Sequence, residues 1–161
     1  MSARTIGGAL VVLALVALHY TLRPILEWRA GVDFLIIAVL VIAVRARPGT
    51  AALAGFAIGL VSDALTPDAF GAGALAMTLV GYTASRMKAT FYTDNVLLNA
   101  LFVFVGKVTF DAIFLVAERR LHGLALVGQL LLWTPLAALV TALVGLAVMA
   151  MVRPTMDRRR P

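Results

Sequence analysis

GFAIGLVSDALTPDAFGAG, residues 55–73, is the stretch of sequence that decides the fold. It has the pattern of the outer half of one membrane helix, a tight polar turn and the glycine-rich start of the next helix. Small residues ending in an acid recur here at every fourth position, namely Ala51, Gly55, Gly59 and Asp63. On a helix this spacing forms a stripe almost free of side chains, which favours the close approach of a second membrane helix.

The composition indicates a membrane protein built from helices. The chain has 161 residues, of which 62% are hydrophobic, and its mean hydropathy is +0.99. A soluble core of this size cannot cover so much apolar surface, so we expect lipid as the solvent. Backbone groups inside a bilayer must hydrogen-bond internally, and long apolar runs without strict alternation favour helices over a barrel. The sequence therefore predicts an all-α integral membrane protein.

The charged and ligating residues exclude several classes of function. The net charge of +6 does not indicate nucleic-acid binding, because the basic residues lie in short clusters between the apolar runs, as topology signals do. The chain has no cysteine, which excludes disulfides and thiolate chemistry. We interpret His19 as an interfacial polar residue and His122 as a loop residue. Neither has a second histidine at ligand spacing, so we expect no metal site and no cofactor.

The expected architecture is a compact bundle of six transmembrane helices. It forms one domain, residues 1–161, with a basic cytoplasmic tail at 153–161. The distribution of basic residues predicts that both termini lie in the cytoplasm, since nine would lie inside and four outside. The helices are expected at residues 6–22, 26–44, 50–65, 69–85, 95–117 and 128–152. The inner set is Arg4, Arg45, Arg47, Arg86, Lys88, Arg153, Arg158, Arg159 and Arg160, and the outer set is Arg23, Arg29, Arg119 and Arg120.

Two of these helices are not simple spans. The second is unambiguous only over residues 32–44, which is too short to cross roughly 30 Å of hydrocarbon, so we expect it to begin near Pro24. The last apolar stretch, residues 124–152, is longer than one span needs. Either this helix is kinked at Pro135, or residues 121–133 lie along the interface and the span begins at Pro135.

Four ionisable residues lie within the expected spans, at middle to outer depth: Asp33, Asp63, Lys107 and Asp111. Charges at this depth are costly and are expected to pair. Lys107 and Asp111 are four residues apart and can meet on one helix face. The alternatives are a structural ion pair, an outward-facing site for a proton or a solute, or acids that reach the outer interface. An aspartic hydrolase that uses Asp63 and Asp111 is disfavoured, because their surroundings are almost purely apolar.

The small-residue stripe also has two interpretations. It packs either against a helix of the same chain, through Gly73 and Gly81, or against a partner's membrane helix. A second small-residue row in the last helix offers a second such face; its members are Ala137, Ala138, Thr141, Ala142 and Gly145. For Asp63 we expect a supporting role, in which it caps the turn or accepts hydrogen bonds from backbone groups near Gly71.

The segment Gly59-Leu-Val-Ser-Asp63, followed by Gly71 after a short turn, resembles the MreD family of bacterial rod-shape-determining membrane proteins. The family pattern is carried by Gly55, Gly59, Asp63 and Gly71. Chain length, helix count and a proline early in the last span agree with it. Lys107 and Asp111 do not belong to this pattern, so the resemblance implies no role for them.

The resemblance implies a non-catalytic scaffold in the bacterial inner membrane. MreD proteins belong to the cell-elongation complex with MreC, and they work with MreB, RodA and its penicillin-binding transpeptidase. Their fold is similar to the substrate-binding subunits of energy-coupling-factor transporters. We therefore expect the MreC membrane helix to bind here, and the alternative is a small-molecule binding or transport subunit that uses the four ionisable residues. The residues expected to contact the partner are Ala51, Gly55, Gly59, Asp63 and Gly71.

Overall fold

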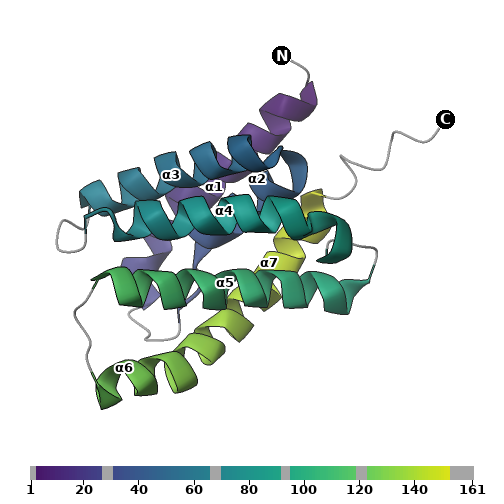
Figure 1. Ribbon diagram of the computed structural model, residues 1–161. Coiled ribbons are helices and arrows are strands. Elements are labelled where there is room, and N and C mark those ends of the chain that lie inside the picture. Colours follow the sequence, from purple (N-terminus) through teal and green to yellow (C-terminus); the bar gives the residue numbers. More distant parts are fainter. Residues whose placement is uncertain (1–2, 27–30, 66–69, 92–94, 119–122, 153–161) are drawn as a thin grey trace.

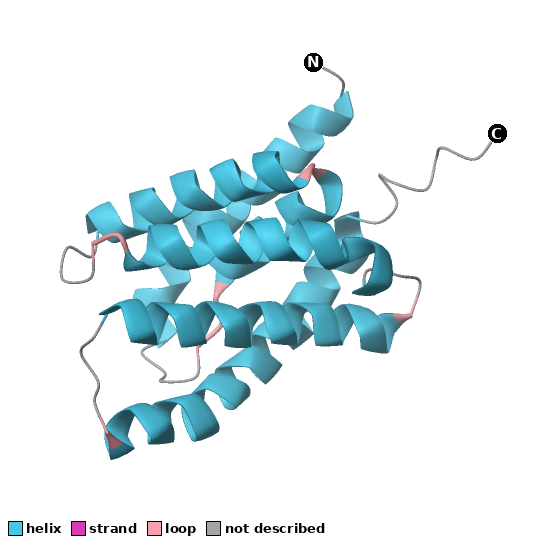
Figure 2. Ribbon diagram, in the orientation of Figure 1, coloured by secondary structure: helices cyan, strands magenta, loops and turns pink. Residues whose placement is uncertain are grey.

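The computed structural model describes residues 3–26, 31–65, 70–91, 95–118 and 123–152, and within these ranges every element is a helix (Figures 1 and 2). The described chain forms six continuous helical stretches, which agrees with the expected all-helical fold class. His122 and the tail 153–161 lie outside the described residues. The elements are α1 (Ala3–Leu26), α2 (Phe34–Arg45), α3 (Pro48–Leu65), α4 (Ala72–Phe91), α5 (Val96–Glu118), α6 (Leu124–Gly128), the π-helical turn η2 (Gln129–Trp133) and α7 (Thr134–Val152).

The centre of the bundle is α2. It packs against α1, α3, α4, α5 and α7, and every side chain from Ile36 to Val41 is fully buried. A helix that is apolar on all sides belongs in a protein interior. With 12 residues α2 is about 18 Å long, so it does not cross a bilayer alone. The non-helical residues 31–33 before it are compatible with membrane depth because protein surrounds this helix.

The helices α3 and α4 lie side by side along their length (Figure 1). A Cβ atom on Gly55 would overlap the carbonyl oxygen of Met77, and one on Gly59 would lie 2.5 Å from the Cα of Ala74. On the facing helix, a Cβ on Gly81 would lie 2.6 Å from the carbonyl oxygen of Ala51. The small-residue stripe therefore lets the two backbones touch, as the intrachain interpretation expects.

The second small-residue row is also used inside the bundle, where α7 packs against α5. Ala138 and Thr141 are fully buried. A Cβ on Gly145 would lie 2.8 Å from the Cγ1 of Val103. Both rows are thus buried within the bundle, and the exposed large apolar side chains of α7, such as Leu139 and Leu143, lie outside the row.

Three helical segments are long and apolar enough to cross a membrane by length and composition: Pro48–Leu65, Val96–Glu118 and Leu126–Met151. Two further apolar segments are shorter, Gly7–Leu22 in α1 and Phe34–Arg45 in α2. Large apolar side chains cover the outside of the bundle, which is the surface expected of a protein in lipid rather than in water.

The expected bounds of four helices need correction, and one of them is the last helix, which begins at Leu124 rather than at residue 128. The first helix continues through Pro24 to Leu26, and the second begins at Phe34 rather than at residue 26, because Asp33 caps it there. The fourth helix continues past residue 85 to Phe91. Its extra turns are anchored by Lys88, whose Nζ donates a hydrogen bond to the Ala46 carbonyl oxygen.

The last helix runs from Leu124 to Val152 without a break and contains the π-helical turn η2 directly before Thr134 and Pro135. In this turn the Thr134 amide donates to the carbonyl of Gln129, five residues earlier. Proline has no amide hydrogen, and a local change of helix register is a common way to accommodate it. The structure therefore matches the first alternative, one continuous helix that is irregular at Pro135.

Candidate functional site

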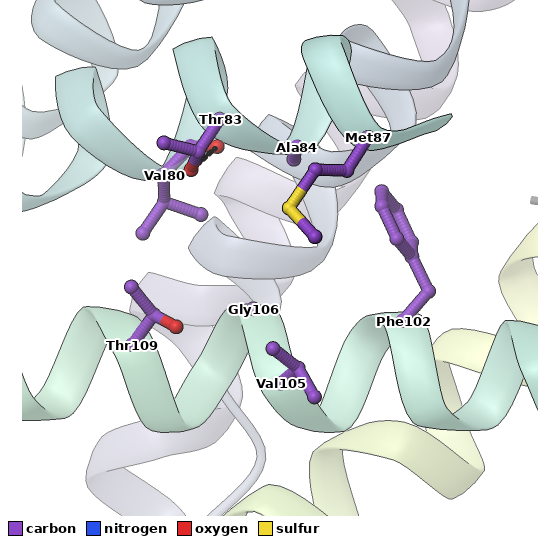
Figure 3. Close-up of a pocket in the computed structure, with 8 residues that line it drawn as sticks. All are labelled: Val80, Thr83, Ala84, Met87, Phe102, Val105, Gly106 and Thr109. Carbon is purple, nitrogen blue, oxygen red and sulfur yellow. Dashed lines mark hydrogen bonds between the residues drawn. The ribbon is translucent and has the colours of Figure 1, made fainter. Parts of the chain in front are cut away.

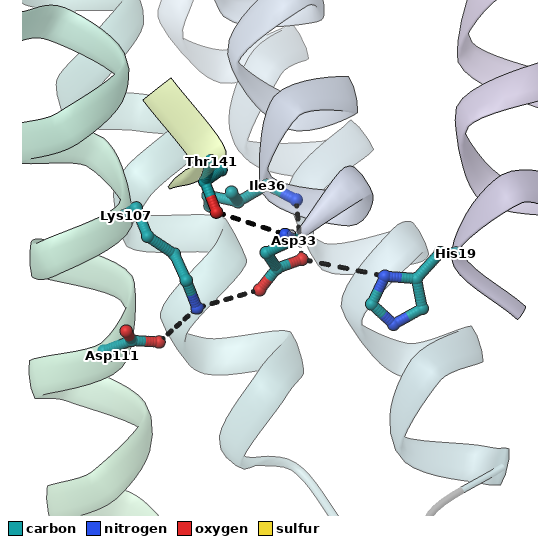
Figure 4. Close-up of polar contacts among 6 residues, drawn as sticks. All are labelled: His19, Asp33, Ile36, Lys107, Asp111 and Thr141. Atoms are coloured by element: carbon teal, nitrogen blue, oxygen red, sulfur yellow. Dashed lines mark hydrogen bonds and ion pairs between the residues drawn. The ribbon is translucent and has the colours of Figure 1, made fainter. Parts of the chain in front are cut away.

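Five polar side chains, from three helices and from the residue before α2, meet in the interior, and we call them the charge cluster (Figure 4). Lys107 of α5 lies between two carboxylates: its Nζ is 3.0 Å from Asp33 Oδ2 and 2.5 Å from Asp111 Oδ1. The predicted pairing of Lys107 with Asp111 is confirmed. The members are His19 of α1, Asp33 before α2, Lys107 and Asp111 of α5, and Thr141 of α7.

Asp33 connects the helices that meet here. Its Oδ1 accepts a hydrogen bond of 3.2 Å from the amide of Ile36, which caps α2, and its own amide donates to Thr141 Oγ1 at 3.2 Å. The imidazole Nδ1 of His19 lies 3.8 Å from Asp33 Oδ1. His19 is 3% exposed, so its side chain is enclosed by the bundle. Asp33 thus makes polar contacts that connect the start of α2 with α1, α5 and α7.

The charged side chains of the charge cluster are largely buried. The side chains of Lys107, Asp33 and Asp111 are 8%, 13% and 15% exposed. Charges this deep are tolerated only when they are paired and hydrogen-bonded. The ammonium also lies 5.1 Å from the ring centre of Phe110. Because the ammonium separates the two carboxylates, the geometry supports the interpretation as a structural ion pair, enlarged by Asp33.

Asp63 forms a separate site at the end of α3. Its Oδ2 accepts hydrogen bonds of 2.9 Å from the amides of Gly71 and Ala74, and its Oδ1 accepts one of 3.1 Å from the amide of Gly73. The supporting role expected for Asp63 is confirmed. Gly71 has φ +97°, a conformation that favours glycine, and this turns its amide toward the carboxylate. The acid satisfies amides at the start of α4 that have no helical partner.

The family model of the rod shape-determining protein MreD matches residues 4–117, more than two thirds of the chain. The chain belongs to the MreD family. No curated protein and no solved structure shows a significant match to it. The family assigns this membrane protein a role in rod-shape determination. The matched part covers nearly all of α1 to α5 and includes Asp33 and Asp111 of the charge cluster and the capping residue Asp63. The helices α6 and α7 lie beyond it.

In this MreD family member, the residues expected to contact a partner are enclosed by the chain itself. Ala51 is fully buried and Asp63 is 2% exposed, and α4 covers the glycines between them. A partner's helix cannot lie on this stripe unless α4 is displaced. The small-residue stripe and the Asp63 carboxylate both hold α3 against α4. The residues that carry the family resemblance therefore stabilise this pair of helices.

Replacing Asp63 with alanine is expected to destabilise the MreD bundle by about 3 kcal/mol, because three amides lose a charged acceptor and α4 loses its cap. Thermal unfolding in detergent measures the effect. Asp63→Asn keeps one acceptor oxygen and should fall between alanine and the native residue. Leu65→Ala, at a side chain that is 60% exposed on the same helix, is the matched control. If Asp63→Ala unfolds at the temperature of Leu65→Ala, the cap contributes nothing.

A shallow groove on the outside of the bundle lies between α4 and α5 and is open to the surface (Figure 3). Its lining is apolar apart from two threonines. Ala84 and Gly106 contribute small residues, and none of the four ionisable residues lines it. The lining residues are Val80, Thr83, Ala84, Met87, Phe102, Val105, Gly106 and Thr109. A small-molecule site requires convergent polar groups in a pocket, which this groove does not provide.

Sequence reasoning missed two members of the charge cluster and the whole groove. The sequence analysis places Thr141 in a small-residue row. A threonine or a histidine in an apolar membrane helix, however, often makes a polar contact with another helix, and this signal could have identified both Thr141 and His19. Asp63 and Asp111 bind different groups, amides for one and Lys107 for the other, so no carboxylate dyad joins them within the described residues. The described residues also hold no group of three His, Cys, Asp or Glu side chains that could bind a metal ion.

Proposed function

We propose that this protein is a non-catalytic scaffold of the bacterial cell-elongation complex. In this role it binds the transmembrane helix of MreC and helps to organise peptidoglycan synthesis with MreB, RodA and its transpeptidase. The observation that carries the proposal is that the intramembrane acids of this MreD family member are used within the fold. Asp33 and Asp111 hold Lys107, and Asp63 holds backbone amides. Such a bundle acts on other proteins through its membrane faces.

The α4–α5 groove is the surface that we propose for the MreC helix. Ala84 and Gly106 are among the residues that line the groove, and small residues let helices approach closely in lipid. Both helices of the groove lie within the part of the chain that matches the family, unlike the exposed face of α7. The partner helix would lay bulky apolar side chains against the apolar lining of this groove. This replaces the α3 stripe as the proposed docking site.

Val105→Trp is expected to reduce co-purification of MreC by at least about fivefold, because a ring at this position fills the groove, and a loss of 1 kcal/mol corresponds to that factor. Val105 is 42% exposed, so the larger side chain can point outward without entering the core. Leu143→Trp on α7, where the native side chain is 70% exposed, is the matched control. Co-expression with tagged MreC and mild detergent extraction provides the measurement. Equal recovery of MreC with both variants would remove the groove from the proposal.

The remaining assignments rest on sequence. An excess of basic residues in the segments expected inside supports a location in the cytoplasmic membrane with both termini in the cytoplasm. We also propose a fold similar to the substrate-binding subunits of energy-coupling-factor transporters. Six helical stretches, five of which pack around the buried α2, are consistent with that likeness. A solved structure that does not superpose on those subunits would reject it.

A further inference from the structure

The end of α4 is fastened to the short link between α2 and α3. Ser85 Oγ donates a hydrogen bond of 2.8 Å to the Ala46 carbonyl oxygen, and Lys88 Nζ donates one of 2.6 Å to the same atom. These contacts bring basic residues from two parts of the chain to one end of the bundle. We call this the basic end; it consists of Arg45, Arg47, Arg86 and Lys88.

The guanidinium groups at the basic end are exposed. Arg45 lies against Gly8 of α1, where a Cβ atom would be 2.6 Å from its Nη1. Arg47 and Arg86 are both exposed, and neither makes an ion pair with any residue in the part of the chain that the structure describes. Two cations at this end thus have no anionic partner among the described side chains.

Acidic residues lie toward the other end of the bundle. In the described ranges, Asp33 precedes α2, Asp63 lies near the end of α3, and Asp111 and Glu118 lie in the second half of α5. The basic end instead contains the last residue of α2, the link before α3 and the last turns of α4. Among the described side chains, the exposed arginines that make no ion pair, Arg47 and Arg86, therefore lie at the opposite helix ends from these acids.

We infer that the basic end is a binding site for the phosphate headgroups of anionic phospholipids. Arg47 is separated from Arg45 by one residue, and Pro48 already begins α3, so these side chains stay at the level where the apolar helices end. That level is the headgroup layer of a bilayer. Guanidinium groups bind phosphate oxygens in pairs, and clustered basic residues next to membrane helices attract anionic lipids. A soluble acidic protein fits less well, because this link does not project beyond the helix ends.

The test compares lipid retention by wild-type protein and by the double variant Arg47→Gln/Arg86→Gln in native mass spectrometry. The probe lipids are phosphatidylglycerol and phosphatidylcholine, and inorganic phosphate is added separately. Wild-type protein should bind phosphatidylglycerol at least about fivefold more tightly than phosphatidylcholine, and the double variant should lose this preference. Both side chains are exposed and make no ion pair, so the variant should keep its unfolding temperature.

Arg119→Gln/Arg120→Gln removes the same charge from a different segment and should keep the preference for phosphatidylglycerol. Arg47→Lys/Arg86→Lys retains charge without the paired guanidinium contacts and should bind with intermediate affinity. The inference is overturned if the two glutamine variants lose lipid equally, or if wild-type protein does not distinguish the two lipids. Displacement of lipid by millimolar inorganic phosphate would assign the site to free phosphate instead. If Arg47→Gln/Arg86→Gln binds lipid like wild type but no longer co-purifies with an acidic cytoplasmic protein, the basic end is a binding site for that protein and the inference is overturned.

Discussion

Replacing Lys107 with methionine should destabilise the folded protein by about 3–5 kcal/mol, which is the range for removal of one partner from a buried ion pair. The native ammonium lies 3.0 Å from Asp33 Oδ2 and 2.5 Å from Asp111 Oδ1. Without it, two carboxylates that are only 13% and 15% exposed face each other with no ammonium between them. A marginally stable membrane bundle does not tolerate a loss of this size.

The measurement is the yield of monodisperse protein together with its unfolding temperature in detergent. The matched control is the triple variant Lys107→Met, Asp33→Asn and Asp111→Asn, which removes all three charges. It should recover most of the lost stability, because the uncompensated charge is gone and asparagine still caps α2. If the single variant unfolds at the wild-type temperature, or if the triple variant is no better than the single one, the charge cluster does not hold the bundle together.

Gly59→Leu should abolish the recovery of folded protein, with a loss of about 3 kcal/mol or more, because overpacking against rigid atoms forces the helices apart. A Cβ atom at this position would lie 2.5 Å from the Cα of Ala74 and 2.6 Å from the carbonyl oxygen of Gly73. Both are backbone atoms and cannot rotate away. If the stripe instead bound a partner's membrane helix, this variant would fold and lose only its partner.

Gly49→Leu is the matched control for this variant. Gly49 lies on the same helix, it is exposed, and no atom lies within 4 Å of an added Cβ. This variant should fold and unfold like wild type. Size-exclusion chromatography and thermal unfolding of both proteins provide the comparison. A well-folded Gly59→Leu protein with normal stability would mean that α4 does not cover the stripe.

The sequence predicted contacts that depend on local spacing. Lys107 and Asp111 are one helical turn apart, so their pairing follows from helix geometry alone. Asp63 stands eight residues before Gly71 across a short turn, which is close enough for a cap to be inferred. Asp33 is 74 residues from Lys107 in the chain, and nothing in the spacing joins them. That contact depends on how α2 and α5 pack, which a single sequence does not specify.

The partner of the small-residue stripe could not be predicted for a related reason. Ala51 and Gly59 show that another backbone comes close, but the same pattern suits a helix of this chain or of another protein. The expected start of α2 is wrong because length arguments favour a full membrane span. In the structure α2 begins only after its N-cap residue Asp33 and is therefore shorter than a span. A buried helix need not span the bilayer when other helices surround it.

The most direct test of the proposed scaffold role is site-specific photocrosslinking in living cells that carry tagged MreC. A photoreactive amino acid is placed at Val105 in the α4–α5 groove or, as the control, at Leu143 on the exposed face of α7. We predict a crosslink to MreC from position 105 and none from position 143. A crosslink from position 143 alone, or no crosslink from position 105 while MreC still co-purifies, would contradict the proposal that this groove binds the partner's helix.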